Sequence, residues 1–149
     1  MVPMDKIKIF LASSIVEFKS IRNKIGEYVL EYNNEYIEKG KKIKLFECEF
    51  HDEAISPLDR KQDEYMEVLK KSDIFLMLIG KKLGNYTKEE YQVALDNNIE
   101  RHIIFFKTNE EDNTVIEFKK HLRKIKESNT YEVTTIDEIK NILYKIVNK

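Results

Sequence analysis

Apolar residues along this chain fall into short runs that alternate with longer, periodic stripes. The short runs predict strands at about residues 7–12, 43–46, 74–79, 103–106 and 131–134. The stripes repeat every three to four positions and predict helices at about residues 15–33, 58–71, 88–98, 115–125 and 136–147. Five strand–helix units in succession predict an α/β fold with one doubly wound, mainly parallel, five-stranded sheet covered by helices on both faces, as in flavodoxin-like proteins. We expect residues 1–149 to form a single domain, because no linker or internal repeat interrupts the pattern.

The run 74–79 is the most apolar of the five and predicts a strand that is covered on both faces. Gly80 and Gly84 then bracket a short loop, and Thr87 opens a helix that carries Glu90 in its first turn. Open parallel sheets bind their ligands just beyond the carboxyl ends of such strands. The sequence therefore predicts a functional site in this segment.

Most predicted helices begin with a hydroxyl residue that is followed, three positions later, by an acid. This spacing is typical of a capping box. The hydroxyl accepts the backbone N–H of the acidic residue, and the acid reaches back to the backbone N–H of the hydroxyl residue. The pairs are Ser14 with Glu17, Thr87 with Glu90, Thr114 with Glu117, and Thr135 with Glu138, and Ser56 with Pro57 and Asp59 is a close variant. By spacing alone Glu90 is a cap like the others, and only its position after the central strand sets it apart.

Ser13 and Ser14 lie where the first strand passes into its helix. Free N–H groups and the positive end of the helix dipole favour an anion there, such as a phosphate or a carboxylate. The alternative is that Ser14 serves only as an N-cap. Since the carboxyl ends of parallel strands share one sheet edge, we expect Ser13, Ser14, Gly80 and Glu90 to line one crevice.

Composition narrows the possible functions. The chain has 26 basic and 27 acidic residues and a net charge of −1, which argues against a nucleic-acid-binding protein. A single cysteine, Cys48, excludes an internal disulfide and suits a reducing compartment, so we expect a cytoplasmic protein without a membrane segment. His51, His102 and His121 are far apart and show no metal-ligand spacing, so no metal site is expected.

The glycine loop does not fit the common phosphate-binding loops. A Walker A loop has four residues between its glycines and a Lys-Ser/Thr pair after the second. Here three residues separate Gly80 from Gly84, and Asn85 and Tyr86 follow. Together with the absence of a Gly-x-Gly-x-x-Gly motif after the first strand, this argues against a P-loop NTPase and a conventional dinucleotide-binding fold.

Several of these segments resemble one known family. The start Ile9-Phe-Leu-Ala-Ser-Ser14, followed by Phe18 and Arg22, is similar to the Phe-(Val/Ile)-Ser-Ser opening of a bacterial TIR-like (Toll/interleukin-1 receptor-like) domain family, formerly described only as a domain of unknown function. That family's later signature corresponds to Ser72-Asp73, Gly80, Leu83-Gly84 and Thr87-Lys-Glu-Glu90-Tyr91-Gln-Val-Ala94. The resemblance spans residues 7 to about 106. It departs at Leu83, where the family commonly has an aromatic residue, and at Ala12, where serine is more usual.

The resemblance implies a specific chemistry. Catalytic TIR domains, and the more distantly related nucleoside deoxyribosyltransferases, act on N-glycosidic bonds with a glutamate on a helix. By this likeness the chain is expected to cleave NAD at the nicotinamide–ribose bond, by hydrolysis or cyclisation, in bacterial antiphage defence or signalling. NAD is then a substrate, no cofactor is required, and a homo-oligomer is expected. The implied catalytic residue is Glu90, and the candidate substrate contacts are Ser13, Ser14, Gly80, Tyr86 and Tyr91.

Two other readings stay open at the level of sequence. In the first reading, the domain is a catalytically silent TIR-like module that signals by self-association. In the second it is an enzyme of the nucleoside deoxyribosyltransferase type, which shares Glu90 but accepts nucleosides. All three readings require the same fold, so the sequence pattern alone does not separate them.

Overall fold

The computed structural model describes residues 5–14, 17–47, 61–126 and 128–148. Its strands form one parallel five-stranded sheet in the order β2-β1-β3-β4-β5. The strands are β1 (Asp5–Ala12), β2 (Lys41–Glu47), β3 (Ile74–Ile79), β4 (Glu100–Phe106) and β5 (Asn129–Val133). The helices are α1 (Lys19–Tyr36), α2 (Lys61–Lys70), α3 (Asn85–Asp96), α4 (Asn113–Ile125) and α5 (Ile136–Val147), with a short 3-10 turn η1 (Ile37–Lys39) after α1. The predicted doubly wound α/β fold is confirmed.

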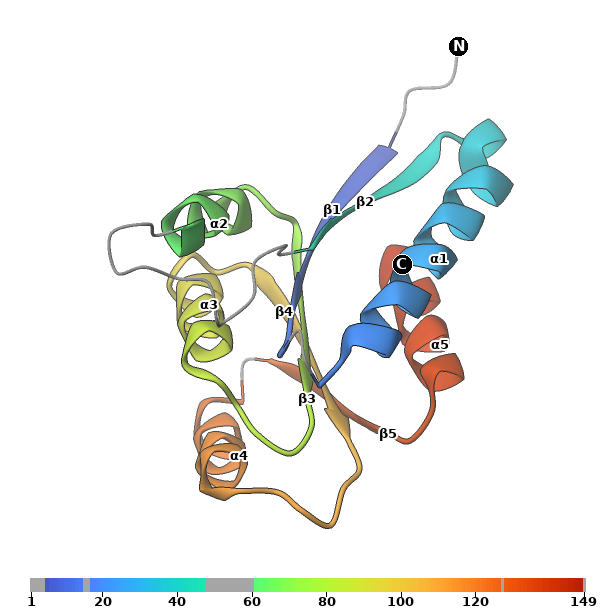
Figure 1. The fold of residues 1–149 in the computed structure, drawn as a ribbon. Coiled ribbons are helices and arrows are strands. Elements are labelled where there is room, and N and C mark those ends of the chain that lie inside the picture. Colours follow the sequence, from blue (N-terminus) through green and yellow to red (C-terminus); the bar gives the residue numbers. More distant parts are fainter. Residues whose placement is uncertain (1–4, 15–16, 48–60, 127, 149) are drawn as a thin grey trace.

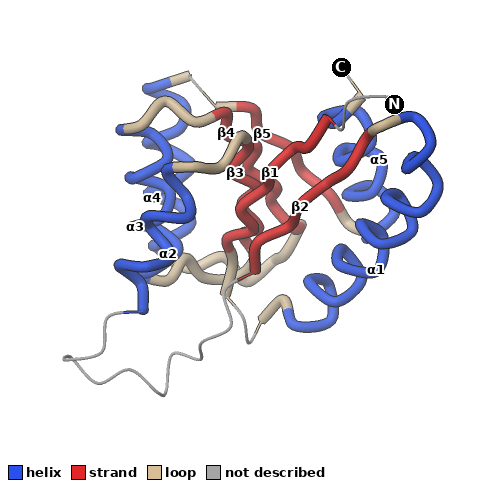
Figure 2. Tube along the Cα trace, turned by 90° about the horizontal axis from the view of Figure 1, so that it is seen from above, coloured by secondary structure: helices blue, strands red, loops and turns tan. Residues whose placement is uncertain are grey.

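The sheet separates two helical layers. Helices α1 and α5 cover one face, and α2, α3 and α4 cover the other (Figures 1 and 2). Every residue of β3 is buried, as expected for a central strand covered on both sides. Because successive side chains point to opposite faces, Leu76 and Leu78 join the core beneath α1 and α5, whereas Phe75 and Met77 join the core beneath the other three helices.

The capping boxes are only partly present. Thr135 caps α5 as predicted, because its hydroxyl accepts the N–H of Glu138 and the Glu138 carboxylate binds back to the Thr134 N–H at 3.1 Å. Helix α4 is capped by Asp112, whose side chain accepts the N–H of Thr114, so the prediction of Thr114 as the cap is wrong. The predicted cap at residues 56–59 lies outside the described residues.

A side chain of α1 occupies the outer edge of β2 at one residue, Ile43. The Asn33 amide donates to the carbonyl of Ile43 at 2.9 Å, and its oxygen accepts the N–H of Ile43 at 2.7 Å. The amide thus occupies the backbone groups that a further strand would use. Within the described part of the chain, no helix has both the length and the apolar character needed to cross a bilayer.

We expect Asn33→Ala to destabilise the fold, because it leaves the N–H and carbonyl of Ile43 without their partner. The expected loss in the free energy of unfolding is about 1–3 kcal/mol, measured by urea denaturation. Asn34→Ala is the matched control, since Asn34 is exposed on the same turn of α1. Alanine favours a helix more than asparagine does, so helix propensity alone would stabilise both variants. A loss of equal size in both would therefore contradict a specific contribution of the Asn33–Ile43 hydrogen bonds.

Candidate functional site

The strand order places a switch point between β1 and β3. From β1 the chain steps outward to β2 on one side, and β3, β4 and β5 follow on the other. In sheets of this order the ligand crevice lies outside the carboxyl ends of the two strands that flank the switch. Ser13 directly follows β1 and Gly80 directly follows β3. Both predicted residues therefore lie at the switch point.

A buried cation accompanies Ser13. The Arg22 guanidinium, on the inner face of α1, donates to the Ser13 hydroxyl at 2.7 Å, and the two residues are 5% and 8% exposed. Sequence reasoning did not select Arg22 as a site residue. A signal was present, since Arg22 is the charged residue within the apolar stripe Phe18, Ile25 and Val29. A fixed guanidinium beside a strand end is suited to recognise phosphate or carboxylate.

The loops after β1 and β3 are joined through Glu17. Its carboxylate accepts the N–H of Lys81 at 2.8 Å, while its own N–H donates to the Ser14 hydroxyl at 3.3 Å. The predicted capping box at Ser14 is thus half correct. The serine hydroxyl accepts the N–H of Glu17 as predicted, but the Glu17 carboxylate binds the loop after β3. A Cβ on Gly80 would lie 2.8 Å from Cδ of Glu17 and 3.0 Å from Cζ of Phe18. The close contact of these two loops brings Ser13, Ser14 and Gly80 together.

We expect the two loop glycines to respond differently to alanine. Gly80→Ala forces the carboxylate of Glu17 and the ring of Phe18 to move, with an expected destabilisation of about 1–3 kcal/mol. Gly84 has open space around it and extended backbone angles, so Gly84→Ala is expected to cost less than about 1 kcal/mol, the difference between glycine and alanine at an N-cap. Thermal unfolding of the two variants side by side tests this, and equal shifts would contradict the close packing at Gly80.

The loop after β3 is also fixed from the side of α4. The Leu83 N–H donates to the Thr114 hydroxyl at 3.0 Å, and the Asp112 N–H donates to the Lys81 carbonyl at 3.0 Å. At the surface, the Lys81 ammonium pairs with Glu110 at 2.9 Å; this hydrogen bond raises the pKa of Lys81 and lowers the pKa of Glu110. The start of α3 is therefore held on both sides.

Glu90 is not a helix cap. Helix α3 begins at Asn85, with Gly84 as its N-cap, and the Lys88 N–H already donates to the Gly84 carbonyl at 3.0 Å. Thr87 is consequently an interior residue of the first turn, and the predicted capping box of Thr87 with Glu90 is wrong. Glu90 is nevertheless only 4% exposed. Burial of a carboxylate is costly, and helix capping does not explain its position.

The direction of Glu90 follows from its neighbour Tyr91. The Tyr91 hydroxyl lies 3.3 Å from Nε2 of His121, and its ring meets that of Phe118 edge-on, with 4.8 Å between centroids. Tyr91 therefore points toward α4. Glu90 lies about 100° away around the helix, on the flank of the buried face that is turned from α4. Because α3 lies between α2 and α4 (Figure 1), this flank is on the side of α2. Helix α2 connects β2 to β3 across β1, so this is also the side of the switch point.

The predicted site residues thus separate into two groups. Ser13, Ser14 and Gly80 lie together at the switch point, and Glu90 lies on the flank of α3 that is turned toward it. Tyr86 is half-buried in the first turn of α3. Tyr91 instead borders a cleft of about 510 Å³ between α3 and α4. Among the described residues, no group of three or more His, Cys, Asp or Glu side chains is arranged to hold a metal ion.

The chain's family is defined by its sequence. Residues 8–147 match the family described as Domain of unknown function (DUF4062). The chain belongs to this family. Among curated proteins, none matches the sequence at a significant level. The expected relation of this domain to TIR domains stays a prediction.

Solved structures with a similar fold include three proteins of different kinds. The translation elongation factor SelB from Methanococcus maripaludis has a TM-score of 0.62 and 17% identity; the match covers 100% of this chain but only 35% of SelB. The CMP N-glycosidase BcmB from Clostridium botulinum has a TM-score of 0.57 and 15% identity, over 93% of this chain and 98% of that enzyme. A conserved protein from Enterococcus faecalis has a TM-score of 0.55 and 15% identity, over 95% and 99%. At these identities the likeness shows the fold alone.

Proposed function

We propose that this protein cleaves the N-glycosidic bond of a nucleotide, with NAD as its leading substrate, and that Glu90 is its catalytic carboxylate. The observation that carries the proposal is the burial of Glu90 on the inner face of α3, with no capping role and on the side of the switch point. A nucleotide N-glycosidase of nearly the same length and the same fold supports the class of reaction.

The chemistry needs one well-placed carboxylate. When the bond between ribose C1′ and the nicotinamide nitrogen breaks, its electron pair leaves with the nicotinamide and positive charge develops on the ribose. A carboxylate fixed in a water-poor position stabilises this charge or holds the ribose hydroxyls. Water then adds to C1′ and releases a proton. Nicotinamide is already cationic in NAD, so a second carboxylic acid is not needed to assist its departure.

The switch point supplies a place for the substrate's phosphates. Arg22 and the hydroxyls of Ser13 and Ser14 bring positive charge and hydrogen-bond donors to the end of β1. Gly80 presents backbone without a side chain at the end of β3. Tyr86, in the first turn of α3, is the candidate neighbour of the base.

A nucleoside 5′-monophosphate is the second candidate substrate. The specific observation in its favour is the likeness to CMP N-glycosidase, which spans 98% of that enzyme and 93% of this chain. A single anion-binding group at Ser13 and Arg22 matches a single phosphate as well as it matches one phosphate of NAD. Nucleosides without phosphate, the substrates of the deoxyribosyltransferase type, would make no use of this group.

The test is base release by the purified protein. Nicotinamide release from NAD and base release from CMP and other nucleoside monophosphates are followed by chromatography over a range of protein concentrations. Release of nicotinamide that steepens with concentration supports an NAD-cleaving enzyme activated by self-association, as suits a role in defence. No release from any substrate at any concentration contradicts the proposal and favours the silent self-association module.

A further inference from the structure

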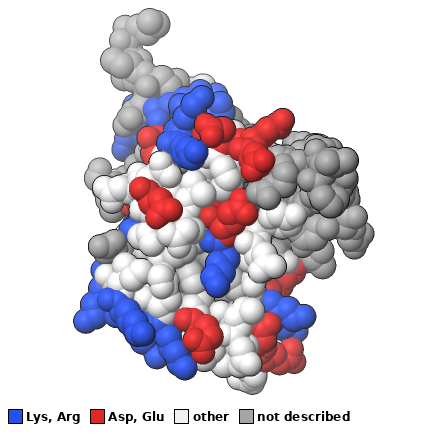
Figure 3. Space-filling model, turned by 90° about the vertical axis from the view of Figure 1, so that its left-hand side faces the viewer, with Lys and Arg blue, Asp and Glu red and all other residues white. Residues whose placement is uncertain are grey.

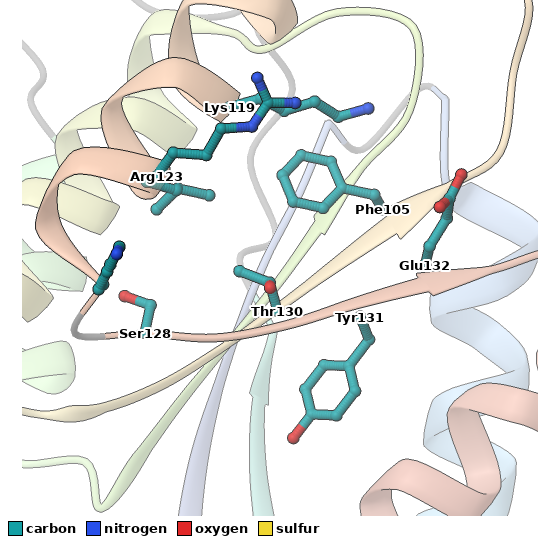
Figure 4. Close-up of a pocket in the computed structure, with 9 residues that line it drawn as sticks. Phe105, Lys119, Arg123, Ser128, Thr130, Tyr131 and Glu132 are labelled. Carbon is teal, nitrogen blue, oxygen red and sulfur yellow. The ribbon is translucent and has the colours of Figure 1, made fainter.

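A groove runs between α4 and the outer edge of β5. It has a volume of about 680 Å³ and contains none of the residues assigned above to the switch point. Figure 4 shows Phe105, Thr130 and Glu132 on the side of the sheet that faces α4, with Lys119 and Arg123 above them, while Tyr131 points to the opposite face. The groove therefore has a floor of strand residues and a wall of basic helix residues.

Along this groove, no backbone hydrogen bond from the described residues takes up the outward groups of β5. Strand β5 is the last strand of the sheet, and the Lys107 N–H donates to the Val133 carbonyl at 2.9 Å. This bond directs the backbone of Val133 toward β4. Because the direction alternates along a strand, the backbone groups of Thr130 and Glu132 point outward. Two residues thus offer N–H and carbonyl groups to an additional strand.

The two edges of the sheet differ in this respect. At β2 the Asn33 amide binds both backbone groups of Ile43. Within residues 5–14, 17–47, 61–126 and 128–148, no side chain does the same for Thr130 or Glu132. An edge left open beside a formed groove is the arrangement in which an extended peptide adds a strand and places alternate side chains in pockets.

The charges along the groove indicate which side chains a bound peptide would carry. Arg123 and Lys126 are exposed on its wall, and Lys119 lies 5.0 Å from the centre of the Phe105 ring while it pairs with Glu111 at 2.6 Å. Glu132 is the acidic residue that lines the groove. Basic side chains also outnumber acidic ones on the surface where α4 lies, and they form a ridge there (Figure 3). Alternate side chains of an added strand that face α4 would therefore meet positive charge.

We propose that the edge of β5 binds an extended acidic segment of a partner protein as a sixth strand, with alternate acidic side chains in the groove against α4. A second copy of this chain is a poorer occupant. Two-fold pairing of β5 with β5 would place both α4 helices on the same face of the joined sheet, so that their cations would repel each other. The proposal concerns a surface separate from Glu90 and does not depend on the proposed enzymatic activity.

The backbone part of the proposal is tested with a matched pair of variants. The probe is a fluorescein-labelled peptide of alternating Glu and Thr residues, and binding is followed by fluorescence anisotropy. Thr130→Pro removes an outward N–H and leaves the bonds to β4 in place, since proline is tolerated at such edge positions. Thr130→Val keeps the N–H and the shape of the side chain. We expect saturable binding that Thr130→Pro weakens at least tenfold and Thr130→Val leaves nearly unchanged. Glu132→Pro repeats the test at the second outward position if Thr130→Pro does not fold.

The charge part is tested by reversal. Arg123→Glu combined with Lys126→Glu is expected to abolish binding, whereas Lys145→Glu on α5 changes the net charge elsewhere and is expected to have little effect. Binding that is lost on charge reversal but unaffected by both proline variants overturns strand addition and points to a small anion in the groove. A dimer of the protein alone that Thr130→Pro dissociates in sedimentation velocity also overturns the proposal, in favour of a second copy. No saturable binding of the peptide to the wild-type protein overturns it outright.

Discussion

Glu90→Gln is expected to reduce the release of base from the substrate at least about a hundredfold while the protein stays folded. Removing one group that stabilises charge in the transition state typically costs enzymes about 10²–10³ in kcat. Glutamine has the shape of glutamate but no negative charge, so it cannot stabilise a developing oxocarbenium ion. The measurement is kcat for nicotinamide release from NAD and for base release from CMP, with a melting curve for each protein.

The structure changes the interpretation of this variant. If Glu90 were part of a capping box, glutamine would make the same hydrogen bond, and a loss of activity could not be attributed to a loss of stability. Because α3 begins at Asn85, no such box exists, and the buried carboxylate at position 90 has no role in starting the helix. We expect Glu90→Gln to remain folded, since the side-chain volume is unchanged, and its melting curve measures any loss of stability separately from the loss of activity.

Glu89→Gln provides the matched control. Glu89 is the preceding residue of the same helix and carries the same charge, but it is less buried than Glu90. We expect it to retain activity within about twofold, as for most substitutions away from a reacting centre. Equal turnover by Glu90→Gln and wild type would contradict the catalytic assignment, and a parallel loss in both variants would show a general effect of helix charge.

The fold was predictable because its signals are local. The apolar run of β3 and the stripe of α5 give Ile74–Ile79 and Ile136–Val147, and in both cases the structure has the predicted bounds. Thr135 was also predictable as a cap, because its partner Glu138 lies in the same turn.

The site was less predictable because its contacts join distant segments. The start of α3 depends on Leu83, whose N–H is bound by Thr114, 31 residues away in the sequence. Glu17 binds the loop after β3 instead of its own helix, over a separation of 64 residues. Thr114 and Glu17 each belong to a hydroxyl–acid pair with capping-box spacing. The local sequence pattern therefore predicts that both residues cap helices. Only the meeting of the loops at the sheet edge shows that tertiary hydrogen bonds take precedence.

A second large effect is expected in the scaffold that carries the site. Leu76→Ala is expected to lower the free energy of unfolding by about 2–5 kcal/mol, because it empties a fully buried position on the central strand. Single domains have a total stability of about 5–15 kcal/mol, so the loss is a substantial part of the whole. Urea denaturation measures it, and an unchanged m-value would show that the folded and unfolded states keep their difference in exposed surface. Leu30→Ala is the control, since Leu30 is 66% exposed on α1.

The two variants separate the roles of scaffold and site. Gly80 follows β3 directly, so loosening of that strand's packing reaches the loops at the switch point before the molecule unfolds completely. We therefore expect Leu76→Ala to lose activity on warming, in parallel with its melting curve, and to keep most of it at low temperature. Glu90→Gln is expected to be inactive at every temperature at which it is folded. A Leu76→Ala protein that is folded but inactive in the cold would contradict this division, because it would make the core of β3 part of the chemistry rather than its support.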